Sequence, residues 1–273
     1  GIRPNKRLGQ NFLVTESIYL KIVGALDLKP ADTVIEVGPG LGTLTQYLSD
    51  SDRKILAVEK DPILANYLKN KFAERENIQI IHADILKFDP GKYHLENGSY
   101  KLVGNIPYYL TSRLLRVVFE KWPQPNVMVF MMQLEVAQKA VAKPPKMTLL
   151  SVATQYYSKP ELVARVDRGN FYPPPEVNSA ILKLAPIKDS TVSNTQTAKD
   201  FFKVVEAGFS SKRKQLITTL PHILKIERGF VEKALLEAKI DPKSRPETLM
   251  VGQWQTLVDV INKYGKLGLY SMI

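Results

Sequence analysis

Four consecutive residues, Asn105, Ile106, Pro107 and Tyr108, combine a side-chain amide, a backbone carbonyl before a proline and an aromatic ring. They follow residues 100–104, an apolar run with the composition of a strand. Proline has no N–H group and cannot continue a central ladder, so we expect residues 105–108 to form a loop at the carboxyl end of that strand. Open α/β sheets bind their ligands at this edge.

These groups are suited to holding the exocyclic amine of a base. The N6 lone pair of adenine is conjugated into the ring, so a methyltransferase must hold both N–H hydrogens and direct the lone pair at the methyl donor. The Asn105 side-chain oxygen and the Ile106 carbonyl are candidate acceptors for these hydrogens. Tyr108 is a candidate stacking partner, worth about 1 to 3 kcal/mol. Catalysis would then come from positioning in a water-poor site, without a general base. For this motif alone, an ordinary strand-to-turn transition is the alternative.

The composition excludes several classes of protein. The chain has 273 residues, 44% of them hydrophobic, which is enough for one large domain and a small one. It has no cysteine and only three scattered histidines, which argues against disulfides and metal centres. The sequence contains no run of 18 apolar residues and no signal-peptide core. We therefore expect a cytoplasmic monomer that has no resident metal and no membrane attachment.

The net charge of +11 favours a polyanionic partner such as RNA, because phosphate neutralisation supplies most non-specific affinity. A lysine-rich solvated surface is the alternative reading of the same charge. Basic residues gather near the start of the chain and again near residue 213. The candidate phosphate contacts are Arg3, Lys6, Arg7, Lys212, Arg213 and Lys214.

Short apolar segments alternate with helical patterns from about residue 14 to residue 133. The expected strands are residues 33–38, 54–59, 78–84, 100–104 and 126–132, followed by a last antiparallel pair, residues 162–166 and 179–184. The expected helices are residues 15–26, 43–48, 62–72 and 112–122. This order predicts an α/β fold with a doubly wound, mostly parallel, seven-stranded sheet.

Two domains are expected from the change in pattern after the last strand. Residues 1–186 should form the catalytic domain, and residues 187–273 should form a small all-α domain. The polar, helix-poor stretch at residues 186–197 has the composition of a linker. Residues 247–264 show an amphipathic helical pattern.

A glycine motif from Glu36 to Gly42 follows the first of the expected parallel strands and opens a helix. Glycines such as Gly38 and Gly40 allow the backbone to pass close to a nucleotide-like ligand. Glu59 ends the next strand, where a carboxylate can accept both hydroxyls of a ribose. Asp84 ends the third, where a carboxylate can accept from an adenine amine. With residues 105–108, these features predict a pocket for S-adenosylmethionine beside a target amine.

Further motifs extend this pattern along most of the chain. These further motifs are Lys6–Leu13, Ala83–Ile85, Phe171–Ser179 and Phe209–Lys214. In combination, the chain resembles the ribosomal RNA adenine N6-dimethyltransferases of the KsgA type, from Lys6 almost to the carboxyl terminus. The resemblance implies the Rossmann-like fold of class I methyltransferases and S-adenosyl-L-methionine as the cofactor.

The resemblance also implies roles for individual residues around the cofactor. Asn11 and Leu13 would close over it, while the glycine motif would approach its amino-acid end. The ribose would be held by Glu59 and the adenine N6 by Asp84. The implied cofactor contacts are Asn11, Leu13, Gly38, Gly40, Glu59, Asp84 and Asn105.

The substrate implied by the resemblance is a pair of adjacent adenosines in a hairpin loop near the 3′ end of small-subunit ribosomal RNA. Each would be methylated twice, within a pre-ribosomal particle that the helical domain helps to engage. Asn105 and Ile106 would hold the target amine. Pro107 would keep the backbone of Ile106 extended, so that the Ile106 carbonyl points outward. Tyr108 and Phe171 would sandwich the flipped adenine.

Some residues depart from the family pattern, and other functions remain open. Leu134 stands where a basic residue is expected, and Met147-Thr148 replace a usual Tyr-Gly pair, which leaves RNA-facing details undefined. A macrolide-resistance methyltransferase of large-subunit ribosomal RNA shares the pocket motifs. A DNA adenine methyltransferase would more usually carry a proline at the position of Ile106. An assembly factor whose RNA binding matters more than methylation is the non-enzymatic alternative.

Overall fold

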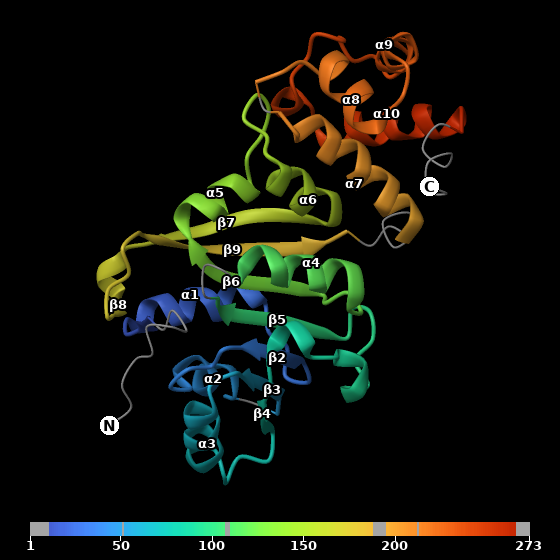
Figure 1. Ribbon diagram of the computed structural model, residues 1–273. Coiled ribbons are helices and arrows are strands. Elements are labelled where there is room, and N and C mark those ends of the chain that lie inside the picture. Colours follow the sequence, from blue (N-terminus) through green and yellow to red (C-terminus); the bar gives the residue numbers. More distant parts are fainter. Residues whose placement is uncertain (1–10, 51, 107–109, 188–194, 212, 266–273) are drawn as a thin grey trace. The chain divides into compact units, whose positions relative to one another are not determined.

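The computed structural model describes residues 11–50, 52–106, 110–187, 195–211 and 213–265 (Figure 1). These residues form two compact units. The first consists of residues 11–138 and Lys159–Pro186, and the second of Lys139–Ser158 and the described part of Ile187–Ile273. The expected boundary at residue 186 therefore coincides with the start of the last segment, but Lys139–Ser158 packs with the second unit.

Among the described residues, seven strands form one sheet in the order β4-β3-β2-β5-β6-β9-β7 (Figure 1). The strands are β2 (Thr33–Val37), β3 (Lys54–Glu59), β4 (Ile78–His82), β5 (Tyr100–Asn105), β6 (Val127–Gln133), β7 (Ser158–Val166) and β9 (Ser179–Pro186). The neighbours from β4 to β6 are parallel, and β9 runs antiparallel to β6. The predicted mostly parallel, seven-stranded sheet is confirmed.

Helices of the first unit connect these strands and cover the sheet. They are α1 (Glu16–Leu26), α2 (Thr43–Leu48), α3 (Pro62–Lys71), α4 (Thr111–Lys121) and the start of α5 (Leu134–Ala140). The start of α3 is fixed locally, since the Asp61 carboxylate accepts from Ile63 N at 2.9 Å and Pro62 occupies the first turn. Nearly every residue of β2, β3 and β6 is buried, as expected for parallel strands covered on both faces.

The end of β5 differs from the expected strand-to-loop boundary. Asn105 is the last residue of the strand and lies opposite Met131 of β6. The ladder continues because Ile106 N still donates to Met131 O at 3.0 Å. Ile106 can make this bond because it has an N–H group, whereas the proline that follows it has none. The bond is therefore compatible with the prediction that Pro107 ends the strand.

A second, two-stranded sheet was not expected. It pairs β1 (Phe12–Leu13) antiparallel with β8 (Phe171–Tyr172), and Leu13 lies opposite Phe171. We call these four residues the β1–β8 ribbon. Val14 N also donates to Asn170 O at 2.9 Å, which extends the connection between the two segments.

The second unit is helical in the residues that the structure describes. Besides the end of α5 it contains α6 (Leu149–Tyr157), α7 (Thr195–Phe209), α8 (Leu216–Leu224), α9 (Arg228–Glu237) and α10 (Val251–Lys263). Residues 139–158 belong to it because Tyr156 stacks on Phe201 with ring centroids 4.1 Å apart, and Met147 N donates to Glu247 O at 3.0 Å. Trp254 is fully buried in this core.

Gly104 allows β5 and β2 to approach each other beneath the site. A Cβ at this position would lie 2.6 Å from Val37 O and 2.9 Å from Val37 Cβ. We expect Gly104→Ala to lower the free energy of unfolding by about 1 to 3 kcal/mol, because backbone must move to admit the methyl group. Denaturant unfolding measures this change.

A matched glycine in the same unit provides the control. Gly24 of α1 has no atom within 4 Å of the added Cβ, so Gly24→Ala should raise the free energy of unfolding by about 0.5 to 1 kcal/mol. Equal stability of the Gly104→Ala variant and the wild type would contradict the close approach of the two strands.

Candidate active site

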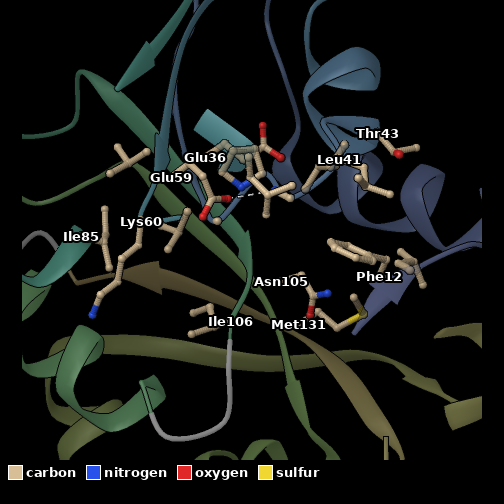
Figure 2. Close-up of a pocket in the computed structure, with 18 of the residues that line it drawn as sticks. Phe12, Glu36, Leu41, Thr43, Glu59, Lys60, Ile85, Asn105, Ile106 and Met131 are labelled. Carbon is tan, nitrogen blue, oxygen red and sulfur yellow. Dashed lines mark hydrogen bonds between the residues drawn. The ribbon is translucent and has the colours of Figure 1, made fainter. Parts of the chain in front are cut away.

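A cavity of about 360 Å³ lies at the carboxyl ends of β2, β3 and β5 (Figure 2). Its walls bring together residues that the sequence places far apart. The predicted site residues that line it are Asn11, Leu13, Gly38, Gly40, Glu59, Asp84, Asn105, Ile106 and Phe171.

The glycine motif forms a turn between β2 and α2. Gly38, Gly40 and Gly42 have φ values of 63°, 60° and 75°, a conformation that glycine adopts without strain. Thr43, which stands where a dinucleotide fingerprint has its third glycine, is instead the first residue of α2 and lines the cavity. The turn thus presents backbone and small side chains to whatever fills the cavity.

Glu59 is a buried carboxylate at the end of β3. Its oxygens accept from Gly40 N at 3.2 Å (Figure 2) and from Asp61 N at 2.9 Å. Burial raises the pKa of Glu59 above its ordinary value, against the opposing effect of these backbone N–H groups. A carboxylate has about four acceptor sites, so acceptor capacity remains after these two bonds.

Asp84 follows β4 and is held by two donors. Leu86 N lies 3.1 Å from Oδ1, and Lys60 Nζ lies 2.9 Å from Oδ2. Burial alone would raise the pKa of Asp84, but the hydrogen bonds from Lys60 and Leu86 outweigh it and hold the pKa below its ordinary value. Asp84 is therefore ionised near neutral pH. Lys60 belongs to no motif in the sequence, and its only signal is its place directly after Glu59.

Asn105 is anchored across the cavity by the amino-terminal segment. Its Nδ2 donates to Asn11 O at 3.2 Å. Only the amide nitrogen can donate to a carbonyl, so this contact fixes which way the Asn105 amide points. The side-chain oxygen keeps its acceptor capacity, and the buried Ile106 follows it in the chain (Figure 2).

The β1–β8 ribbon closes another wall. Leu13 and Phe171, which lie opposite each other in the ribbon, are 6% and 5% exposed, and both line the cavity. The Phe12 ring also lines the cavity and lies beside the Gly40 turn, 3.2 Å from where a Cβ on Gly40 would stand (Figure 2).

Glu36, the first residue of the glycine motif, also lines the cavity. It is 1% exposed, and its Oε2 atom has no hydrogen-bond partner among the described residues. Burial, reinforced by the charge of Glu59, raises the pKa of Glu36 to about 8, although Thr45 and Lys71 oppose the shift. The cavity therefore contains a buried polar atom with unused hydrogen-bonding capacity.

The remaining predicted residues lie elsewhere. Arg213 and Lys214 are exposed residues between α7 and α8 of the second unit. Six predicted residues lie outside the described part of the chain: Arg3, Lys6, Arg7, Pro107, Tyr108 and Lys212. Their roles stay predictions.

The described residues contain neither a membrane-spanning helix nor a cluster of metal ligands. No described helix has the length and apolar character needed to cross a membrane. Within the same residues, no group of three or more His, Cys, Asp or Glu side chains is arranged to hold a metal ion.

The mostly parallel sheet, with the glycine turn after β2 and the cavity at the strand ends, has the architecture of a class I methyltransferase. Residues 1–263 match the family model described as "Ribosomal RNA adenine dimethylase". The chain belongs to this ribosomal RNA adenine dimethylase family, as the sequence resemblance predicted.

Relatives and solved structures agree with this assignment. Two relatives named "Ribosomal RNA small subunit methyltransferase A" come from Dehalococcoides mccartyi and Pelotomaculum thermopropionicum. The first is 44% identical over 94% of this chain and 88% of its own, and the second is 41% identical over 95% and 92%. The structure of the 23S rRNA methyltransferase ErmE is 29% identical, with a TM-score of 0.75 over 92% of this chain and all of its own. A Plasmodium falciparum dimethyladenosine transferase, at 24% identity, shares the fold with a TM-score of 0.78 over 93% and 98%.

The buried Glu36 predicts a pH dependence of stability. Its pKa rises from an ordinary 4.5 to about 8 on folding, so the folded chain keeps a proton that the unfolded chain releases between these values. Glu36 therefore makes stability fall as pH rises through this window. We expect the unfolding free energy to decrease less for Glu36→Gln than for the wild type when the pH is raised from 5.5 to 8. Denaturant titration at each pH measures the difference.

The exposed Glu74 supplies the control, because its carboxyl lies at the surface of the same unit. Glu74→Gln should keep the wild-type pH dependence. A parallel change in the unfolding free energies of Glu36→Gln and the wild type between pH 5.5 and pH 8 would contradict the raised pKa of Glu36 in the folded chain.

Proposed function

We propose that this chain uses S-adenosyl-L-methionine to dimethylate N6 of two adjacent adenosines in a hairpin loop near the 3′ end of small-subunit ribosomal RNA. The substrate would be a pre-ribosomal particle, so the reaction belongs to small-subunit biogenesis. The relatives at 41% and 44% identity carry small-subunit names, which supports this choice of RNA. One observation carries the chemistry: Asn105 lies in the same cavity as Glu59 and Asp84.

The cofactor half of the cavity fits S-adenosyl-L-methionine by its chemistry. Glu59 retains acceptor capacity for two ribose hydroxyls, and the ionised Asp84 can accept from an adenine amine. The glycine turn leaves room for the amino-acid end, near the unpartnered Oε2 of Glu36. When bound, the cofactor supplies an activated methyl group on a sulfonium.

The target half of the cavity positions an amine. Because Asn11 O engages the amide nitrogen of Asn105, the side-chain oxygen remains as acceptor for one N6 hydrogen. The Ile106 carbonyl takes the second, and its own N–H is already fixed on Met131 O. Holding both hydrogens turns the N6 lone pair toward the methyl donor, so the rate comes from orientation. Phe171, together with Tyr108, stacks on the base.

The remaining residues would recognise the RNA around the target. An unpaired loop adenosine costs less to extrude than a paired one, which suits a pocket that must hold a flipped base. The exposed Arg213 and Lys214 are proposed phosphate contacts, together with Lys212 and the basic amino-terminal residues. Their contribution would be electrostatic, independent of base identity.

A second candidate is methylation of large-subunit ribosomal RNA. It is supported by the likeness to ErmE over 92% of this chain, but at 29% identity against 44% for the first relative above. The same cavity chemistry serves either RNA, so the substrate must be determined directly.

Labelled cofactor and separated ribosomal subunits, assembled from unmodified RNA, test the proposal. We expect label on two adjacent adenosines of the small subunit, each carrying two methyl groups, located by mapping the modified nucleotides. In the same assay Asn105→Ala should reduce the rate at least about a hundredfold, because the amine loses its acceptor, while binding of S-adenosylhomocysteine persists.

Two outcomes would contradict this account. Label on a large-subunit adenosine would select the second candidate. An Asn105→Ala variant with the turnover of the wild type would remove Asn105 from the amine site.

The basic residues of the second unit predict a salt effect. Arg213→Ala combined with Lys214→Ala should weaken binding of the small-subunit particle and reduce the slope of log affinity against log salt, because fewer counterions are released. Filter binding at several salt concentrations measures the slope. Lys199→Ala with Lys233→Ala removes the same charge from exposed helical positions and is expected to change it less. Equal slopes for the two double variants would argue against specific phosphate contact.

A further inference from the structure

The hydroxyl of Tyr19 makes a buried hydrogen bond at the wall of the cavity. Tyr19 belongs to α1, is 7% exposed and is one of the residues that line the cavity. Its hydroxyl donates to Leu13 O at 2.6 Å. The bond therefore connects α1 to β1, six residues earlier in the chain.

The Tyr19 hydroxyl stays protonated in its buried position. Thr43, the first residue of α2, lowers the pKa of this hydroxyl against the larger effect of burial. Burial raises the pKa of Tyr19 to about 12, which keeps the donor protonated throughout the neutral range. Thr43 directly follows the glycine turn and lines the same cavity as Tyr19.

The ring of Tyr19 is fixed by a second tyrosine. Tyr47 of α2 stacks on it with ring centroids 5.5 Å apart and planes inclined by 16°. The Tyr47 hydroxyl donates to Glu16 at 2.9 Å, in a solvent-exposed bond. Tyr47 itself is outside the set of residues lining the cavity. The two hydroxyls thus have different surroundings although the rings form one stack.

The position of Leu13 affects both halves of the cavity. Leu13 lies directly opposite Phe171 in the ribbon, and each contributes to the cavity wall. Leu13 is a proposed cofactor contact, and Phe171 is a proposed stacking partner of the target base. A hydrogen bond that holds the Leu13 carbonyl therefore acts on both through one backbone pairing.

We propose that Tyr19 is a positioning residue whose hydroxyl holds the β1–β8 ribbon against α1, and so sets the cofactor wall and the target wall together. The inference rests on the proposed function, since it assigns those walls to S-adenosyl-L-methionine and adenosine. The sequence pattern assigns Tyr19 no role, because its hydroxyl meets the Leu13 carbonyl only in the fold.

The contribution of the hydroxyl is greatest in the complex. In the free protein, water in the cavity can hydrogen-bond to the Leu13 carbonyl if the hydroxyl is removed. A bound cofactor expels this water, and the carbonyl is then buried without a donor, which is costly. Tyr19→Phe should therefore weaken ligand binding more than it destabilises the free protein.

Tyr19→Phe removes the hydroxyl and keeps the stacked ring. We expect the dissociation constant for S-adenosylhomocysteine, measured by calorimetry, to rise about three- to tenfold, the range that one net hydrogen bond supplies. The KM values for cofactor and for RNA should both rise, while kcat at saturation changes less than either. Without ligand, Tyr19→Phe should unfold at a denaturant midpoint close to that of Tyr47→Phe.

Tyr47→Phe is the matched control, since it removes a hydroxyl from the same stack without touching the cavity. It should bind cofactor and RNA like the wild type. Wild-type affinity and KM values in Tyr19→Phe would overturn the inference, as would a loss confined to the stability of the free protein. If the wild type bound no cofactor, the proposed function and the inference would both fail. If the wild type methylated RNA and Tyr19→Phe matched it, only the inference would fail.

Discussion

The parallel register of β2 with β3 and β5 is the constraint on which the site depends. Val37, the last residue of β2, lies opposite Val58 of β3 and Gly104 of β5. Glu59 and Asn105 each follow one residue later, so a carboxylate and an amide emerge at the same level on either side of the glycine turn. Hydrogen bonds of a parallel sheet fix this level, and a slip of one residue would turn both side chains to the wrong face. The absence of a side chain at position 104 allows the close approach of β5 to β2.

The cavity combines this rigid edge with groups that do not favour stability. Two carboxyl groups, Glu36 and Glu59, are buried beside each other, and burial raises the pKa of both. Such an arrangement is expected where a site must present acceptors to a ligand, because unused acceptor capacity is what a ribose or an amine needs. Asp84 has a different environment, because its ion pair with Lys60 keeps it charged at the more exposed end of the cavity. The site thus contains carboxyl groups in distinct environments, set by burial and by their donors.

Much of this arrangement could be predicted because it depends on local pattern. Alternating strands and helices predicted the sheet, and acids at strand ends predicted Glu59 and Asp84, since parallel strands end at one edge. The β1–β8 ribbon could not be found in this way, because two-residue strands have no period and their partners lie more than 150 residues apart. The same limit applies to the Lys60–Asp84 pair and to the packing of Lys139–Ser158 with the second unit, which depend on tertiary contacts.

The central claim is that one edge of the sheet holds both the methyl donor and the amine acceptors. A crystal structure of the chain with S-adenosylhomocysteine tests it most directly. The account predicts that both ribose hydroxyls donate to Glu59, that the adenine amine donates to Asp84, and that the sulfur is directed toward the side of the cavity lined by Asn105. A ligand bound outside this cavity, or one whose ribose makes no contact with Glu59, would contradict it.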